Sequence, residues 1–278
     1  MNKARSSEPV IDRDAAAALI DPLTDLVIRA GAAILAVNRV AMKIDGKLDG
    51  SPVTEADLAA DRIIGEGLAW LIPSVPALSE ERVHPAKPPY RGSFFLIDPL
   101  DGTKEFVAGR AEFTVNLALV TNGTPLLGII GAPALGLIWR GLVGRGAERL
   151  TNRDGAVGTA EPIHTRAFPK GGAPWMAAVS RSHGDKRTEA FIAARPGATR
   201  IALGSAVKFG RVAEGGADIY PRLAPTSEWD VAAGHAIVTA AGGRITDSQG
   251  KDLRFGERRE GFLVPEFIAW GDPAAAAI

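Results

Sequence analysis

The 278-residue sequence predicts an α+β half followed by an α/β half. In the first half, two segments with apolar residues at helical spacing come before several strand-like segments joined by short turns, an order typical of helices followed by an antiparallel meander. In the second half, strand-like and helix-like segments alternate, which is typical of an α/β arrangement. We place the boundary near residue 165, so the expected units are residues 1–165 and 166–278.

The first helix is expected to begin at Asp21 and Pro22. Asp is a favoured N-cap residue, and Pro fits the first helical position because its missing N–H has no helical partner there. Apolar residues then recur at helical spacing as far as about residue 38. Residues 1–20 are expected to form an arm with at most a short helix.

A second helix is expected to begin after Thr54 and to end before Pro73. Thr54 and Asp57 fit a capping box, in which a hydroxyl and an acid three residues later bond each other's backbone N–H groups. The capping box gives Asp57 a structural explanation that is sufficient by itself.

The remaining elements alternate with turn signals. Asn122 and Gly123 predict a hairpin, because both residues tolerate positive φ. The boundary between the two halves is expected within the glycine-rich residues 144–172. The tail, residues 271–278, is expected to be frayed. The expected strands are 75–78, 93–97, 112–120, 126–132, 137–143, 175–180, 199–203, 218–221 and 244–246, and the later helices are 186–194, 206–214 and 230–241.

Composition excludes several classes of function. The chain has 32 basic and 32 acidic residues, and nucleic-acid-binding surfaces usually show a basic excess, so no nucleic-acid partner is expected. The absence of cysteine excludes disulfides and thiol chemistry, and four histidines argue against a multi-histidine zinc site. The N-terminus does not resemble a secretory signal, and the longest apolar stretch is too short to span a bilayer. We expect a cytoplasmic protein, with peripheral contact at the inner membrane and the oligomeric state left open.

Residues 98–106 directly follow a predicted buried strand. Pro99 cannot continue a hydrogen-bond ladder and Asp101 begins an Asp-Gly turn pair, so the chain must bend here. Two carboxylates therefore lie at the carboxyl end of a strand, where open α/β sheets bind ligands. Asp98, Asp101 and the carbonyl of Leu100 are oxygen donors of the kind that Mg²⁺ prefers. The alternative is a plain turn in which Asp98 bonds its own backbone.

Other polar residues lie near predicted strand ends or helix starts. Glu80 follows a short strand and is either ordinary surface or a third carboxylate of the same site. Ser227 and Asp230 fit a second capping box. Arg and Lys side chains after the later strands suit a phosphate if they converge, although each is unremarkable alone. This last group comprises Ser180, Arg181, His183, Gly204, Ser205, Lys208 and Arg222.

The stretch Asp98-Pro-Leu-Asp-Gly-Thr-Lys-Glu-Phe106 resembles the signature of the lithium-sensitive, Mg²⁺-dependent phosphatases of the inositol monophosphatase superfamily. Its Thr-Lys-Glu-Phe ending is similar to that of the CysQ-type 3′(2′),5′-bisphosphate nucleotidases. The resemblance implies a layered α-β-α-β-α sandwich of the sugar-phosphatase type. Further motifs in the family's order are Ser-Pro-Val-Thr-Glu-Ala-Asp at 51–57, Ser-Glu-Glu at 79–81, Ser-Arg-Ser-His at 180–183, Gly-Ser-Ala-Val-Lys-Phe at 204–209, Tyr-Pro-Arg at 220–222 and Trp-Asp-Val-Ala-Ala-Gly at 229–234.

The resemblance also implies a role for each site residue. Glu80 and Thr103 would orient an attacking water, and Asp57 would complete the catalytic group. The ligands of two or three Mg²⁺ ions would be Glu80, Asp98, Leu100, Asp101 and Asp230. The substrate-binding residues would be Gly102, Thr103, Ser180, Arg181, His183, Gly204, Ser205, Lys208, Arg222 and Asp230.

The expected activity is hydrolysis of the 3′-phosphate of adenosine 3′,5′-bisphosphate to AMP and phosphate, by water activated at a two-metal centre. The partner is therefore a small phosphorylated molecule. One alternative is an inositol or sugar monophosphatase of the same superfamily, which needs no second phosphate site. The other is a catalytically degenerate Mg²⁺-binding regulatory protein, which the complete set of carboxylates disfavours.

Overall fold

The computed structural model describes residues 9–39, 41–42, 44–46, 52–82, 89–153, 155–182, 184–195, 197–257 and 262–277. Among the predicted site residues, His183 lies outside these ranges.

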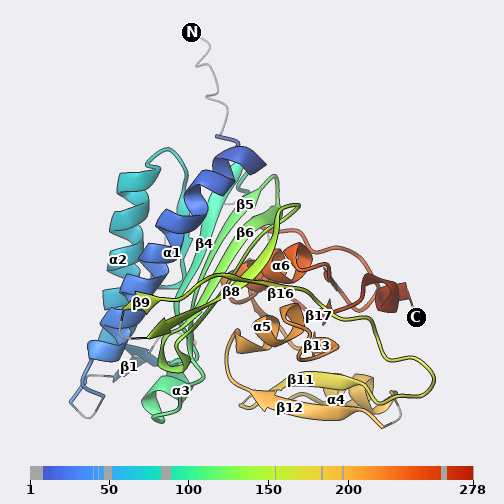
Figure 1. Ribbon diagram of the computed structural model, residues 1–278. Coiled ribbons are helices and arrows are strands. Elements are labelled where there is room, and N and C mark those ends of the chain that lie inside the picture. The colour runs from blue at the N-terminus through green and yellow to red at the C-terminus, as the bar shows by residue number, and fades with distance from the viewer. Residues whose placement is uncertain are drawn as a thin grey trace.

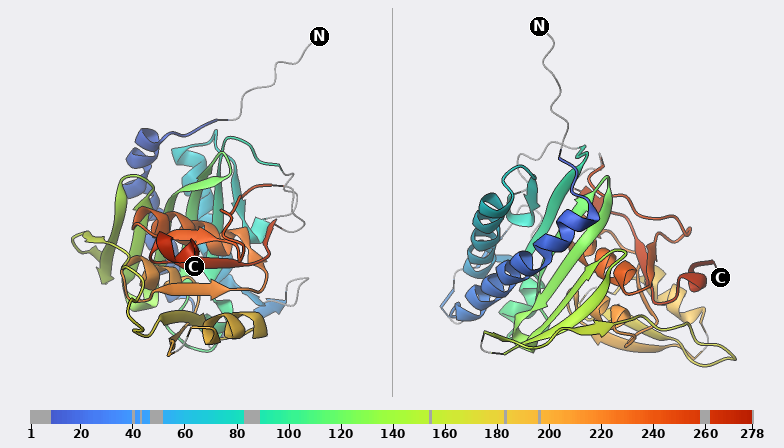
Figure 2. Two further views of the ribbon diagram at one scale, coloured as in Figure 1. Left: turned by 90° about the vertical axis from the view of Figure 1, so that its right-hand side faces the viewer. Right: turned by 45° about the horizontal axis from the view of Figure 1, so that its top comes forward.

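Helices and sheets stack in alternating layers (Figure 1). The helices α1 (Arg13–Ala36) and α2 (Glu55–Leu71) pack against each other on one face of a large sheet, and the C-terminal elements lie on its other face (Figure 2). There, α5 (Val207–Ala213) and α6 (Glu228–Ala240) separate the large sheet from a smaller one. The last layer is α4 (Lys186–Ala193), which packs on the smaller sheet away from α5. The chain thus has the predicted α-β-α-β-α arrangement.

The large sheet is a meander. It has eight strands, in the order β10-β8-β7-β6-β5-β4-β3, with β9 paired to β8, and only β3 and β4 run parallel. Asn122 and Gly123 have φ values of 51° and 75°, so the predicted hairpin turn is confirmed. The strands are β3 (Ala77–Ser79), β4 (Ser93–Asp101), β5 (Thr114–Thr121), β6 (Thr124–Ala132), β7 (Leu137–Leu142), β8 (Gly146–Arg153), β9 (Ala156–Val157) and β10 (Glu161–Ile163).

The smaller sheet is mixed. Its five strands have the order β12-β11-β13-β17-β15, in which β12, β11 and β13 are parallel and β17 runs antiparallel to both of its neighbours. Alternate residues of β11, β13 and β17 face α5 on one side and α4 on the other, so both faces of these strands are buried, whereas the edge strand β12 is mostly exposed. The strands are β11 (Met176–Ser180), β12 (Thr199–Leu203), β13 (Ile219–Arg222), β15 (Arg244–Thr246) and β17 (Phe267–Trp270).

Short elements complete the described chain. The strands β1 (Ile44–Gly46) and β2 (Pro52–Thr54) form one two-stranded ribbon, and β14 (Thr226–Ser227) and β16 (Leu263–Val264) form another. Helix α3 (Thr103–Val107) follows β4, and 3-10 turns occupy Glu80–Arg82, Pro133–Leu135 and Pro273–Ala277. Ala275 in the last turn is 2% exposed, so the expectation of a frayed tail is wrong.

The predicted start of the first helix is also wrong. Helix α1 begins at Arg13, with the side chain of Asp12 accepting a hydrogen bond from the Ala15 N–H, and Pro22 lies inside it. An internal proline costs about 3 kcal/mol because it removes one helical hydrogen bond and crowds the preceding turn. Residues on both sides of it, including Ala16 and Leu23, are fully buried, and this packing offsets the cost.

Buried side chains from both halves of the chain form one cluster between the two sheets. It includes Phe94 and Trp139 from the large sheet and Phe209 and Phe267 from the second half. The passage from one sheet to the other falls between β10 and β11, and the division near residue 165 stays a prediction. Among the described residues, no helix is both long and apolar enough to cross a bilayer.

Candidate active site

A pocket of about 350 Å³ lies where the loop after β4 meets the ends of the strands of the smaller sheet. Carboxylates, hydroxyls and cations from both halves of the chain line it. The predicted site residues among them are Glu80, Asp101, Gly102, Thr103, Ser180, Ser205, Lys208, Arg222 and Asp230. Asp57, Asp98, Leu100, Arg181 and Gly204 lie behind or beside this lining.

The loop after β4 is shaped by an irregularity in the strand rather than by its end. The pairing of β4 with β5 shifts between Asp98 and Asp101, so the ladder skips Pro99 and Leu100 and resumes for one residue. Asp98 is 1% exposed, and its Oδ1 accepts a hydrogen bond from the Leu100 N–H at 3.1 Å. The local turn envisaged as the alternative is therefore present.

Only glycine fits well at position 102. Its φ is 88°, and an added Cβ would lie 3.3 Å from the Cβ of Ser205 and 3.4 Å from the carbonyl oxygen of Glu112. A residue with a side chain would be strained in this left-handed conformation and crowded by both neighbours. Gly102 therefore lets the chain turn sharply from Asp101 into α3.

Thr103 and Asp57 join the second helix to this loop. The hydroxyl of Thr103 lies 3.2 Å from Asp57 Oδ1 and 3.2 Å from the Leu100 carbonyl oxygen, and it can donate to either. The other oxygen of Asp57 accepts from the N–H and hydroxyl of Thr54 at 2.8 and 2.6 Å, as the capping box requires. Asp57 thus has two roles: it caps α2, and it holds the Thr103 side chain at the pocket.

Asp230 likewise serves a helix cap and faces the pocket. Its Oδ2 accepts from the Ser227 N–H at 3.1 Å and from the Thr226 hydroxyl. Burial and the negative charge of Asp101 raise the pKa of the Asp230 carboxyl. A cation between Asp101 and Asp230 would remove that repulsion.

The donors fit a hard divalent cation, because the predicted ligands offer only oxygen atoms. Within the described ranges, however, no three His, Asp or Glu side chains are grouped closely enough to form a metal cluster by themselves.

Two cations reach the same pocket from the second half. Lys208 is 2% exposed, and its ammonium donates to the carbonyl oxygens of Leu203 and Ser205 at 3.3 and 2.5 Å. Burial lowers the pKa of Lys208 to about 8. Arg222 donates to the Pro225 carbonyl at 3.4 Å, and its buried Nε has no hydrogen-bond partner among the described residues. An unpaired buried N–H at a pocket is the kind of group that an anionic ligand satisfies.

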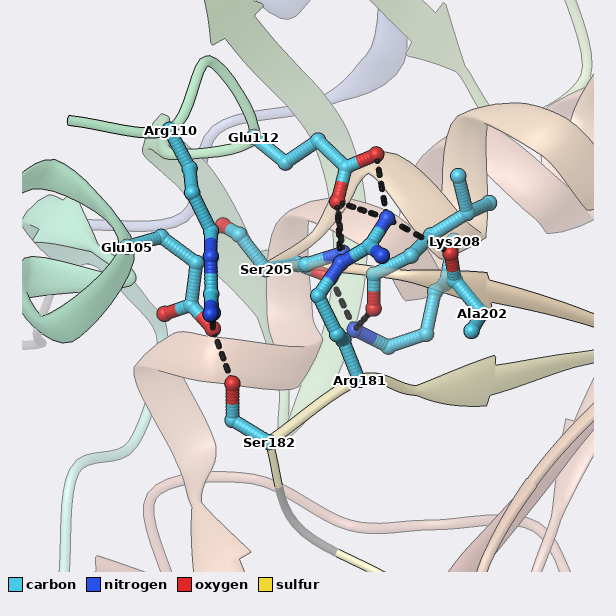
Figure 3. Close-up of polar contacts among 10 residues, drawn as sticks. Glu105, Arg110, Glu112, Arg181, Ser182, Ala202, Ser205 and Lys208 are labelled. Atoms are coloured by element: carbon cyan, nitrogen blue, oxygen red, sulfur yellow. Dashed lines mark hydrogen bonds and ion pairs between the residues drawn. The ribbon is translucent and has the colours of Figure 1, made fainter. Parts of the chain in front are cut away.

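Arg181 is engaged elsewhere. Its guanidinium donates to both carboxylate oxygens of Glu112 at 2.8–3.1 Å and to the Ala202 carbonyl at 2.9 Å (Figure 3). The N–H of Gly204 donates to the same carboxylate at 2.8 Å. The structure therefore brings Arg181 and Gly204 to the edge of the site without exposing them in the pocket.

The sequence did not single out several residues that line the pocket. Tyr220, Thr226, Trp229 and Leu263 are among them. Trp229 and Tyr220 lie in motifs that were recognised, next to residues with obvious charges. Leu263 comes from a short strand far along the chain, and no local pattern marks it.

The chain was compared with known proteins. It matches the inositol monophosphatase family over residues 16–276. It is 38% identical to the 3′(2′),5′-bisphosphate nucleotidase CysQ of Escherichia coli and 40% identical to that of Salmonella typhimurium, each over 90% of this chain and 98% of the relative. The crystal structure of CysQ from Bacteroides thetaiotaomicron aligns with a TM-score of 0.75 at 34% identity, covering 91% of this chain and 97% of that one. An inositol monophosphatase from Zymomonas mobilis aligns with a TM-score of 0.72 at 28% identity, covering 95% and 99%.

Proposed function

The chain belongs to the inositol monophosphatase family, and from that premise we propose that it is a 3′(2′),5′-bisphosphate nucleotidase. Its preferred reaction is removal of the 3′-phosphate of adenosine 3′,5′-bisphosphate to give AMP and phosphate. The observation that carries this choice is the pairing, in one pocket, of an acidic side with two cations, the buried Lys208 and the half-buried Arg222. A substrate with two phosphates can use both sides.

The acidic side suits the metal-dependent part of the reaction. Glu80, Asp98, Asp101, Asp230 and the Leu100 carbonyl would hold two or three Mg²⁺ ions. Bound Mg²⁺ would lower the pKa of the attacking water and would neutralise the negative charge that develops on the departing oxygen. Glu80 and the Thr103 hydroxyl orient that water, and Asp57 fixes the Thr103 side chain through the contact at 3.2 Å.

The cationic side suits the phosphate that is not cleaved. Lys208 and Arg222 both line the pocket, and the buried Lys208 has little freedom to move, which lowers the entropy that is lost when a phosphate binds. Ser180, Ser205 and Gly102 line the space between these cations and the loop after β4. Arg181, Gly204 and His183 complete the proposed substrate-binding set, the first two from beside the pocket.

An inositol or sugar monophosphatase is the second candidate, because inositol monophosphatases share the fold and much of the chain length. That function needs the acidic side and makes no use of Lys208 and Arg222. Location in the cytoplasm and contact at the inner membrane stay predictions from the sequence. The oligomeric state stays open.

The test compares phosphate release from adenosine 3′,5′-bisphosphate and inositol 1-phosphate in the presence of Mg²⁺. For the wild-type protein we expect a large preference in kcat/KM for the bisphosphate. Replacement of Arg222 by Ala should lower kcat/KM for the bisphosphate by about ten- to a hundred-fold, the value of one charged hydrogen bond, and leave the inositol ester nearly unchanged. The matched control is Arg244→Ala, which removes an exposed ion pair with Asp252 away from the pocket.

A wild-type preference for inositol 1-phosphate, or an equal loss on both esters in Arg222→Ala, would favour the monophosphatase. Metal binding without phosphate release from either ester would favour a regulatory protein.

A further inference from the structure

Glu112 joins two segments of the second half to the loop that follows β4. It lies between α3 and β5, and its carboxylate faces the ends of β11 and β12 (Figure 3). One partner is the guanidinium of Arg181, at 2.8–3.1 Å. The other is the N–H of Gly204, at 2.8 Å. A single carboxylate therefore holds the chain just after each of two neighbouring strands.

The turn that contains Gly204 is a junction between the two sides of the pocket. The Ser205 hydroxyl lies 2.6 Å from Asp101 Oδ2 and 3.0 Å from the Asp101 carbonyl oxygen. The carbonyls of Leu203 and Ser205 accept from the Lys208 ammonium. If this turn shifts, Asp101 on the acidic side and Lys208 on the cationic side both lose a fixed partner.

The turn packs closely against Glu112 and Glu105. A Cβ on Gly204 would lie 2.5 Å from the Glu112 carbonyl oxygen, 2.9 Å from its Cβ and 3.2 Å from Glu105 Cγ. Ser205 has a φ of 52°, which is uncommon outside glycine and persists only where surrounding contacts hold it. Beside it, the Ser182 hydroxyl donates to Glu105, so a second carboxylate anchors the neighbouring loop.

We propose that Glu112 is a positioning residue for the reaction, which fixes the Gly204–Ser205 turn and thereby places Asp101 and Lys208 in the pocket. The proposal rests on the proposed function for its substrate. It gives the Arg181 guanidinium a place in this scaffold, so that Arg181 supports substrate binding from beside the pocket while Lys208 and Arg222 line the pocket itself.

Two substitutions separate the parts of this contact. Glu112→Gln keeps an amide oxygen that can accept from the Gly204 N–H, and it loses the charge that pairs with Arg181. Glu112→Ala loses both. We expect kcat/KM for adenosine 3′,5′-bisphosphate to fall by about ten- to a hundred-fold in Glu112→Ala, the range for one lost hydrogen bond to a charged group, and only a few-fold in Glu112→Gln. Because Asp101 is affected, kcat should fall as well as KM rise.

The matched control is Glu148→Ala. Glu148 accepts from Nε and Nη2 of Arg140 at 3.0 and 2.9 Å, the same fork as at Glu112, and it is remote from the pocket lining. It should change kcat/KM by less than about two-fold. Equal losses in Glu112→Ala and Glu112→Gln, or no loss in Glu112→Ala, overturn the proposal.

Two further measurements test the route through the turn. In a double-mutant cycle with Ser205→Ala, the two losses should be less than additive, since both changes break the same connection to Asp101. Additive losses overturn the proposal. Hydrogen–deuterium exchange of peptides covering residues 203–208 should be faster in Glu112→Ala and unchanged in Glu112→Gln and Glu148→Ala. Unchanged exchange in Glu112→Ala overturns it too.

Failure of the proposed function is distinguishable from failure of this inference. A wild-type protein that hydrolyses inositol 1-phosphate and not the bisphosphate refutes the substrate assignment. The cycle is then measured on the inositol ester, because the Ser205 contact to Asp101 serves either reaction.

Discussion

The burial of His235 leads us to predict that the free energy of unfolding falls in acid. His235 lies in α6, is 7% exposed and packs edge-on against Phe255, and its Nδ1 is buried with no hydrogen-bond partner in the described part of the chain. Burial lowers the pKa of His235 from 6.5 to about 4, while the charge of Asp252 acts weakly in the other direction. The imidazole is therefore neutral in the folded protein over a pH range in which the unfolded chain is protonated.

The size of the effect follows from linkage. Because the unfolded state binds more protons between pH 6.5 and about 4, the free energy of unfolding falls as pH is lowered through that window. Each pH unit contributes about 1.4 kcal/mol, so His235 alone accounts for a loss of about 3 kcal/mol by pH 4. The loss should level off below the folded-state pKa. This is a large share of the ~5–15 kcal/mol stability of an ordinary domain.

The assay is urea denaturation of the wild-type protein and of His235→Phe, at intervals from pH 7.5 to pH 4. Phenylalanine has a similar shape and no proton to bind, so the stability difference between the two proteins should move by about 3 kcal/mol in favour of the variant. All carboxylates titrate in both proteins and cancel in the comparison. The control is a Gln substitution at the exposed His164, which removes an imidazole outside this packing. Parallel curves for His235→Phe would refute the assignment of a depressed pKa.

Two other changes test the site and the packing beneath it. Asp101→Asn retains an acceptor for Ser205 and removes the charge, so turnover at saturating Mg²⁺ should fall by about a hundred-fold or more, and near-normal turnover would remove Asp101 from the ligand set. Gly128→Ala would place a Cβ 2.2 Å from the Ala233 carbonyl oxygen of α6, backbone that cannot yield locally. We expect a loss of about 3 kcal/mol in urea denaturation, whereas Gly46→Ala, whose added Cβ meets no atom of the described residues within 4 Å, should stay close to wild type.

Local chemistry in the sequence determined much of the site. Thr54 with Asp57 and Ser227 with Asp230 form the predicted capping boxes, because each needs only residues three apart on the chain. The same proximity explains the confirmed turn at Asn122. Strand and helix alternation in the second half was predicted for similar reasons, and the family motifs located the pocket-lining residues that the structure brings together.

Contacts between distant residues decided the rest. Pro22 remains inside α1 because packing on the sheet outweighs a local penalty, which no local signal reports. Strand β8 forms from a glycine-rich stretch because β7 offers a partner for its backbone groups, and β8 in turn pairs with β9 and β10. Glu112 meets Arg181 and Gly204 across separations of 69 and 92 residues. The sequence alone determined which charges the site has, and the tertiary structure decided which of them face the pocket and which hold its walls, since that depends on what each side chain meets after folding.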